Sequence, residues 1–496
     1  MNTNLPSHDQ KQWLEEYFTK IKEHAKNRKK QIIDISNNIK NILADDLKEG
    51  ERNEIWFHLH ELEKAYTGFQ EALERPELVI ATTGTTSSGK STLANFLIGE
   101  AILPSAVQEM SAGLVRVKHG EKRSLTIPKT QGATWETGSW DGLTADEVCQ
   151  RLEETMMAFR KEEESNKEIE PVLFEIEWPI RLAERKEELG LPEGTQVTIL
   201  DLPGLKAVND KRNGPIIQAN IDKAFCLVAY NAEETDEVKQ QNLLNQVVNQ
   251  VMALSYGKED GEEENTETSQ RRGQISSLSR MLFLLNRIDA FLRHDDGDEQ
   301  LEKFKGKITQ QLQEKLKRSL PNNEDVVQHI ENIKLAQICS LPALWAVEAD
   351  RLWEKPDEQV KVLEKIEVFK DILPKDDKGK SCLHRLPRDF EELNNSEEIP
   401  EDERRTLIKK LIDDTLKGSQ ANNFKQRLLS HIGKNLLEII IGGQANVMCL
   451  AYNRLSDILC SLLESETNSE MYVFCEYVLR QIEKFNPYLA ESFSDL

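Results

Sequence analysis

A short glycine-rich segment constrains this chain more than any other feature. Residues 84–91 read GTTSSGKS, which fits the pattern G-x-x-x-x-G-K-[ST]. The apolar run at 77–83 has the composition of a buried β-strand, and residues 91–97 favour a helix. A glycine-rich loop between a strand and a helix can direct successive backbone N–H groups into one concavity at the helix N-terminus. The segment therefore predicts a P-loop, a site for a nucleotide polyphosphate. A plain Ser/Gly-rich turn is the alternative, and the flanking strand and helix argue against it.

Individual residues of this loop have expected roles. Gly84 and Gly89 supply the backbone freedom that the loop path requires. Lys90 is expected to bridge the β- and γ-phosphates, and the Ser91 hydroxyl is expected to ligate Mg²⁺. The remaining residues expected to line the phosphate site are Thr85, Thr86, Ser87, Ser88 and Thr92.

A second motif, residues 198–204 (TILDLPG), places a carboxylate at the end of an apolar strand. Asp201 is predicted to hold the Mg²⁺ through a water molecule. The Gly204 N–H is predicted to sense the γ-phosphate and to couple its loss to loop movement. Asp-x-Pro-Gly alone is a common turn, but its place after a buried strand and downstream of a P-loop makes it specific.

Base selection is expected at residues 284–289 (LLNRID), where another apolar strand opens into polar residues. The Asp289 carboxylate can accept both the N1 and the exocyclic amino hydrogens of guanine, which adenine does not offer. Asn286 can bond the other edge of the base, and Arg287 can lay its aliphatic stem on the base plane. The pattern favours GTP and GDP over ATP. Ser340, after the apolar run 335–339, is expected to close over the base, although a simple strand and turn would also explain that run.

The rest of the chain shows two kinds of pattern. Between 77 and 350, apolar runs alternate with helical periodicity, which predicts an α/β fold with a mostly parallel central sheet and helices on both faces. The further strand candidates are 114–117, 172–177, 197–200, 224–229, 281–285 and 335–339. We expect N-terminal helices of a bundle at 1–76, the nucleotide-binding domain at 77–350, a linker at 351–400 and a C-terminal helical bundle at 401–496.

Composition excludes several other classes of function. The chain carries 64 Lys and Arg against 87 Asp and Glu, a net charge of −23, which disfavours general attraction to nucleic acid or anionic lipid. The N-terminus lacks the basic flank and apolar run of a signal peptide, which predicts a cytoplasmic protein. Seven scattered cysteines without a Cys-x-x-Cys pair indicate reduced thiols rather than disulfides or zinc. Neither a His-Glu-x-x-His nor a Gly-x-Ser-x-Gly motif is present.

Together the motifs resemble those of a GTPase of the dynamin superfamily, nearest to mitofusins and bacterial dynamin-like proteins. The segments that carry this resemblance are 86–92 (TSSGKST), 95–99 (NFLIG), 103–105 (LPS), 201–204 (DLPG) and 286–289 (NRID). The motifs cover 77–350, and over the flanks only the layout of helices is similar. The resemblance implies nucleotide-dependent homodimerisation through the GTPase domain, GTP hydrolysis with Mg²⁺, and movement of a helical bundle built from both chain ends. It also implies a role in membrane remodelling, by peripheral contact or through partner dynamin-like proteins.

The resemblance also assigns catalytic residues, with some departures from the family pattern. Ser111 is the residue expected in switch I, where its hydroxyl would contact Mg²⁺ and the γ-phosphate. Ser87 and backbone groups of the loop would act with Lys90 to stabilise transition-state charge within a dimer. Thr86 stands where many dynamins have glutamine, and Leu205 stands where small GTPases have the glutamine that orients water. Two alternatives remain open: a GTP-switched scaffold with little or no hydrolysis, and a P-loop ATPase.

Overall fold

The structure of this protein is a computed structural model, and its described residues fall into two compact units. The first unit contains residues 78–191 and 196–439, and the second contains residues 6–77, 192–195 and 440–496. The described residues are 49–84, 87–105, 113–130, 133–164, 172–185, 191–192, 194–202, 224–234, 278–292, 296–320, 324–374, 400–436 and 438–465, with residue 245 and a few positions between 16 and 34.

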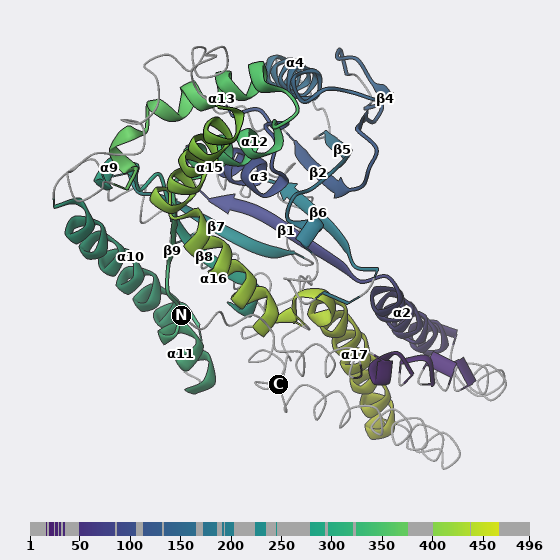
Figure 1. The fold of residues 1–496 in the computed structure, drawn as a ribbon. Helices are drawn as coiled ribbons and strands as arrows, with labels where there is room; N and C mark the ends of the chain where they lie inside the picture. Colours follow the sequence, from purple (N-terminus) through teal and green to yellow (C-terminus); the bar gives the residue numbers. More distant parts are fainter. Residues whose placement is uncertain are drawn as a thin grey trace. The chain divides into compact units, whose positions relative to one another are not determined.

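A nine-stranded sheet forms the centre of the first unit, in the order β4-β3-β5-β2-β6-β1-β7-β8-β9 (Figure 1). The strands are β1 (Glu77–Gly84), β2 (Leu114–His119), β3 (Ser124–Ile127), β4 (Gly138–Asp141), β5 (Leu173–Trp178), β6 (Gln196–Asp201), β7 (Phe225–Asn231), β8 (Met281–Asn286) and β9 (Ala336–Ile338). Parallel pairing joins β1 to β7, β7 to β8, β8 to β9, and β2 to β5. The predicted mostly parallel sheet is therefore confirmed.

Antiparallel pairing is confined to the other end of the sheet. There β2 pairs with β6, and β3 pairs with both β4 and β5. The apolar patterns do not predict β3 or β4, because β3 buries only alternate residues and β4 buries none. Such short, half-solvated strands carry too little hydrophobic signal to be distinguished from a loop.

Helices cover both faces of this sheet. Alternation along β7 turns Cys226, Val228 and Tyr230 toward one face, where they share a core with Leu312 and other apolar residues of α10 (Gly297–Ser319). Phe225, the residue before Cys226, points to the opposite face, where its ring lies 5.4 Å from that of His431 on α16 (Ala421–Lys434). The helices of this unit are α3 (Lys90–Ile98), α4 (Ala145–Glu164), α9 (Asp289–Leu292), α10 (Gly297–Ser319), α11 (Glu324–Glu331), α12 (Ser340–Arg351), α13 (Pro356–Glu367), α15 (Glu401–Gly418) and α16 (Ala421–Lys434), with 3₁₀ turns at Ala183–Arg185 and Lys370–Ile372.

The C-terminal boundaries differ from those expected. Residues 351–400 contain α13 rather than only a linker, and α15 and α16 belong to the sheet-containing unit rather than to the second unit. The apolar side chains Val360, Leu363 and Ile366 recur along one side of α13 and pack in one core with α12 and α15. This stripe is narrow and lies among charged residues, so the segment has the overall composition of a linker.

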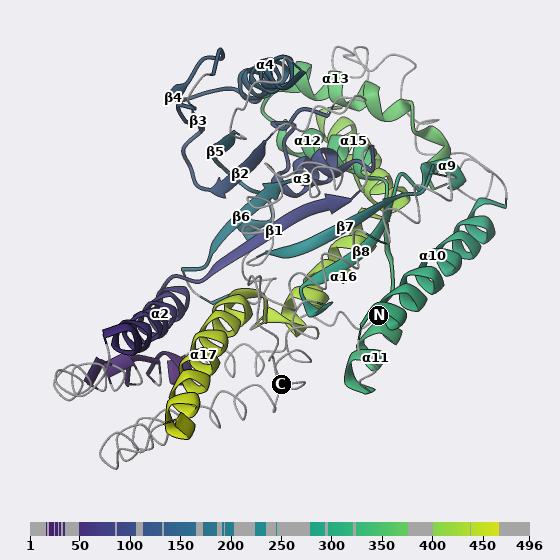
Figure 2. The same cartoon turned by 180° about the vertical axis from the view of Figure 1, so that it is seen from behind.

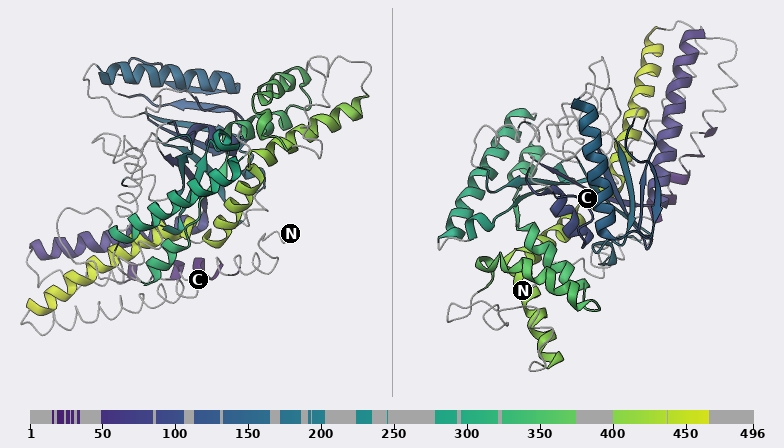
Figure 3. Two further views of the ribbon diagram at one scale, coloured as in Figure 1. Left: turned by 90° about the vertical axis from the view of Figure 1, so that its left-hand side faces the viewer. Right: turned by 90° about the horizontal axis from the view of Figure 1, so that it is seen from above.

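The second unit places helices from distant parts of the sequence together. In it α2 (Glu49–Glu74) packs against α17 (Gly443–Ser465), and the two helices lie alongside each other in Figures 2 and 3. Gly68 of α2 faces α17 so closely that an added Cβ would lie 3.1 Å from Oε1 of Gln444. A π-helical turn, Glu438–Gly442, precedes α17. Among the helices that the structure describes, none is long and apolar enough to cross a membrane.

Candidate functional site

The P-loop leaves β1 along a path that only glycine permits at two positions. Gly84 has φ +145°, and a Cβ there would lie 2.2 Å from the carbonyl oxygen of Ala229 on the neighbouring strand. Gly89 has φ +76° and precedes α3 as its N-cap. Ser87 also has positive φ, 64°, and its side chain is exposed, whereas Ser88 and Lys90 are buried. The loop therefore delivers Lys90 into the protein at the N-terminus of α3, as the motif predicts.

Asp201 brings the end of β6 to this loop. Its Oδ2 accepts a hydrogen bond from the Ser91 hydroxyl at 2.6 Å. Burial raises the pKa of the Asp201 carboxyl, and the Ser91 hydrogen bond, the Lys90 charge and the Thr82 hydrogen bond each oppose that rise. A hydroxyl and a carboxylate held together are the oxygen ligands that Mg²⁺ prefers beside a nucleotide phosphate. The donor set therefore fits the metal that the motifs imply.

Thr82 is a site residue that sequence reasoning missed. Its hydroxyl donates to Oδ1 of Asp201 at 2.9 Å, so that the two carboxylate oxygens have different partners. Thr82 is completely buried in the middle of β1. Hydroxyls in an otherwise apolar strand were the available signal, but threonine is common in strands and suggests no function by itself.

Asn286 joins three segments of the site. Its side-chain amide N–H groups donate to the Ser88 carbonyl at 2.8 Å and to the Ser340 hydroxyl at 2.9 Å. Its carbonyl oxygen accepts from the backbone N–H of Arg287 at 2.9 Å and of Ser340 at 3.0 Å. These four bonds use the full hydrogen-bonding capacity of the amide within the protein. The Asn286 side chain therefore holds the P-loop in place. Both of its N–H groups are used for this, so neither is left for the base edge.

The other predicted base-binding residues surround this amide. Asp289 is a buried residue at the start of α9, and its carboxylate lies beside the thiol of Cys339, where it adds to the rise in thiol pKa that burial causes. Arg287 has φ 61°, and its guanidinium donates to the Glu233 carboxylate at 2.8 Å. The ends of β7, β8 and β9 therefore converge on the predicted guanine-binding segment.

Four predicted residues lie outside the described residues: Thr85, Thr86, Ser111 and Gly204. Of the others, Gly84, Gly89, Lys90, Ser91 and Asp201 meet around the P-loop, and Asn286, Arg287, Asp289 and Ser340 meet at the ends of β8 and β9. Ser87 and Thr92 lie on the loop and on the first turn of α3. Among the described residues, no group of three His, Cys, Asp or Glu side chains is arranged to hold a further metal.

Asn95 connects α3 to the segment that follows it. The Asn95 side chain is fully buried and donates to the Leu103 carbonyl at 2.8 Å. Its oxygen accepts from the backbone N–H groups of Ile102 at 3.2 Å and Leu103 at 2.9 Å. Gly99 closes α3 with φ +89°. The amide thus fastens the segment that follows α3 back onto the helix that begins at the P-loop.

Comparison with known proteins finds a family model that matches part of this chain. Residues 80–282 match the model of the dynamin family. Dynamin-like protein A of Bacillus subtilis (strain 168) is 25% identical over 240 residues, which are 48% of this chain and 15% of that protein. The chain therefore spans less than a sixth of the length of this relative.

Two solved structures of bacterial dynamins are similar to this chain, both at low sequence identity and low TM-score. A structure described as an oligomerised bacterial dynamin pair that senses and tethers membranes at long range is 15% identical, with a TM-score of 0.34 over 94% of this chain and 79% of that one. The bacterial dynamin GTPase LeoA from ETEC is 13% identical, with a TM-score of 0.28 over 96% of this chain and 77% of that one.

We predict that Gly89→Ala destabilises the protein, whereas Gly306→Ala does not. An alanine Cβ at position 89 would lie 2.5 Å from Nδ2 of Asn286 and would need a left-handed backbone conformation. We expect the free energy of unfolding to fall by about 1–3 kcal/mol. Gly306 is an exposed residue inside α10 with nothing within 4 Å of the added methyl. There we expect a gain of up to about 1 kcal/mol. Urea unfolding of both variants tests this, and equal effects would contradict the role given to Gly89.

Proposed function

We propose that this chain binds GTP and GDP with Mg²⁺ and hydrolyses GTP, and the match of residues 80–282 to the dynamin family model supports this proposal. The observation that carries the proposal is the Asn286 amide, which bonds to Ser88 of the P-loop and to Ser340 of α12. The P-loop is thereby held in a fixed position relative to the segment that carries the Asp289 carboxylate, which is suited to guanine. An ATPase has no use for the Asp289 carboxylate at that position, because adenine offers no N1 hydrogen.

Each residue then has a defined task. Lys90, buried at the N-terminus of α3, would neutralise β- and γ-phosphate charge together with the backbone N–H groups of the loop. Ser91 and Asp201 would hold Mg²⁺, Ser91 directly and Asp201 through water. The metal supplies charge stabilisation to the phosphates while bound. Asp289 would accept the two guanine hydrogens, while Arg287 would cover the base plane and Ser340 would close the base pocket.

Efficient hydrolysis is proposed to require a homodimer. Leu205 cannot orient a water molecule as a glutamine does. We propose that a second copy completes the site across the nucleotide face, where Ser87 is exposed, and that Ser111 contacts Mg²⁺ and the γ-phosphate. Dimerisation would drive movement of the helical unit that contains α2 and α17. Peripheral action at a membrane, alone or with partner dynamin-like proteins, is part of this proposal.

Phosphate release measured at increasing protein concentration tests the enzymatic part. The rate per molecule should rise with concentration, since the active species is a dimer. The Lys90→Ala variant should lose activity at least about hundredfold, because phosphate charge is no longer neutralised. Tight GTP binding with no turnover at any concentration would contradict the enzymatic proposal and favour the GTP-switched scaffold.

We predict that Thr82→Val lowers the affinity for Mg²⁺ without preventing nucleotide binding. Valine keeps the shape of threonine but removes the hydroxyl that holds Asp201. Loss of such a supporting contact typically costs about 10-fold or more in metal affinity. GDP affinity measured against Mg²⁺ concentration should show that loss, whereas GDP affinity in EDTA should match that of the wild type.

Thr83→Val is the matched control for this experiment. Thr83 is 1% exposed, but alternation along β1 directs its side chain to the face opposite Thr82. The Mg²⁺ affinity of the Thr83→Val variant should stay within about twofold of that of the wild type. If the Mg²⁺ affinity of Thr82→Val is also unchanged, the Thr82 hydrogen bond has no positioning role.

A further inference from the structure

The turn that follows β7 is fastened to the end of β8. Asn231, the last residue of β7, is the register partner of Asn286 in β8. The Ala232 N–H donates to the Asn286 carbonyl at 2.9 Å. The Asn231 side chain then folds the turn, because its Oδ1 accepts from the Glu233 N–H at 2.9 Å. A further bond joins the Glu234 N–H to the Asn231 carbonyl at 3.2 Å. The backbone of Glu233 is therefore fixed relative to β8.

Arg287 is the residue that this turn contacts through a side chain. Its guanidinium donates from Nη1 to Oε2 of Glu233 at 2.8 Å. The backbone of Arg287 is left-handed, with φ 61°, and its N–H donates to Oδ1 of Asn286 at 2.9 Å. The two ends of the arginine thus have separate anchors, the backbone at the end of β8 and the guanidinium at the turn after β7. The aliphatic stem spans the distance between these anchors.

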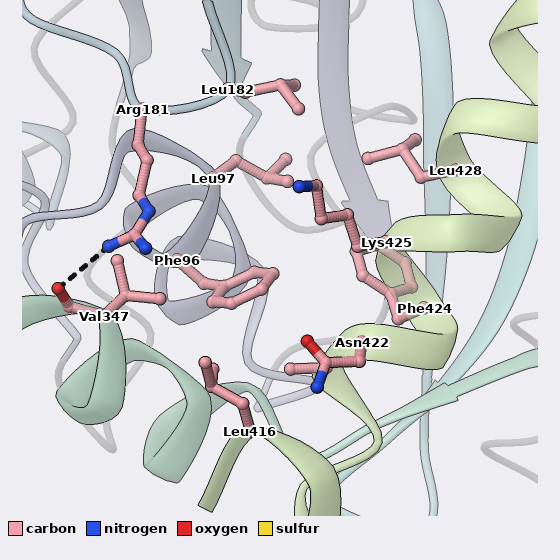
Figure 4. A pocket seen from close by; sticks show the side chains of 11 residues that line it. Phe96, Leu97, Arg181, Leu182, Val347, Leu416, Asn422, Phe424, Lys425 and Leu428 are labelled. Atoms are coloured by element: carbon pink, nitrogen blue, oxygen red, sulfur yellow. Dashed lines mark hydrogen bonds between the residues drawn. The ribbon is translucent and has the colours of Figure 1, made fainter. Parts of the chain in front are cut away.

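An arginine that only connects structural elements has different surroundings. The Arg181 guanidinium donates to the Val347 carbonyl at 3.1 Å, as Figure 4 shows, and to Asp350 at 2.7 Å. The Arg181 side chain is 18% exposed, whereas that of Arg287 is 40% exposed. Part of the Arg287 stem is therefore accessible to a ligand while its charged end is already paired.

The ion pair between Glu233 and Arg287 contributes little to folding stability. Both side chains are exposed by about two fifths, and water and salt weaken ion pairs between such groups. The effect of the pair is to restrict the arginine to one orientation. A side chain with as many rotatable bonds as arginine lowers the affinity for a ligand when it must be ordered on binding. An arginine that is already ordered avoids this loss.

We propose that Glu233 is a positioning residue for guanine, which holds the Arg287 guanidinium so that the aliphatic stem is ready to cover the base plane. Asp289 would select the edge of the base, and Glu233 would strengthen the contact with its face. Glu233 belongs to none of the sequence motifs. This inference rests on the proposed function, because it requires that Arg287 contacts the base.

Calorimetric titration of the full chain with GDP and with inorganic pyrophosphate, both with Mg²⁺, separates the base from the phosphates. In Glu233→Gln the affinity for GDP should fall about fivefold, because the arginine must then be ordered on binding. The affinity for pyrophosphate should not fall, since removing a negative charge does not weaken the attraction of an anion. Equal weakening of both ligands, or an unchanged affinity for GDP, would overturn the proposal.

A double-mutant cycle tests whether Glu233 acts through the arginine. Arg287→Met keeps an unbranched apolar stem and removes the guanidinium. In that background Glu233→Gln should change the affinity for GDP by less than about 1.5-fold, because no charged end remains to be held. Glu233→Asp keeps the carboxylate and should bind GDP more tightly than Glu233→Gln does. An effect of Glu233→Gln that persists in Arg287→Met would overturn the assigned role.

Glu401→Gln is the matched control, since Glu401 forms an exposed ion pair with Arg405 on α15 at 3.1 Å. It should leave the affinities for both ligands unchanged. The wild-type protein separates failure of this inference from failure of the proposed function. If it binds GDP no more tightly than pyrophosphate, base recognition fails and the inference fails with it. If the wild type prefers GDP and Glu233→Gln has the same preference, only the inference fails.

Discussion

The Asn286 side chain holds the P-loop against the end of β8 and against the first residue of α12. Its four hydrogen bonds lie between 2.8 and 3.0 Å, and the side chain is completely buried. In such surroundings an unmade bond is costly, so the three segments must move together or not at all. The P-loop and the segment that we propose to select the base are thereby held together by one side chain. The same contact adds to the need for glycine at position 89, because a Cβ would not fit beside this amide and the backbone there is left-handed.

Burial also affects the charged side chains beside the P-loop. Lys90 and Asp201 are both almost inaccessible to water, and burial makes the charged form of the Asp201 carboxyl costly. Two hydroxyls, those of Thr82 and Ser91, and the neighbouring Lys90 charge offset part of that cost. Binding of Mg²⁺ and polyphosphate would offset more, because each charge then gains a full partner. Under the proposed function, nucleotide binding would therefore increase local stability.

Sequence patterns predict the elements that carry strong local signals. The P-loop, its flanking strand and helix, and the apolar strands β7 and β8 are clear because burial on both faces produces continuous apolar runs. The exposed strand β4 and the narrow apolar stripe of α13 give weaker signals and are missed. Thr82 and the bridging role of Asn286 could not be predicted either. Both depend on contacts with residues that are distant in the sequence, which only the order of strands in the sheet brings together.

We propose that Asp289 selects guanine beside the P-loop, and exchanging its carboxylate for an amide tests this proposal most directly. Asn at 289 cannot accept both guanine hydrogens, but it can donate to the C2 carbonyl of xanthine. Equilibrium titration of wild-type protein and Asp289→Asn with GDP and xanthosine diphosphate measures the exchange. We predict that the wild type prefers GDP and that the variant reverses the preference, each by at least about tenfold. Identical preferences in the two proteins would contradict it.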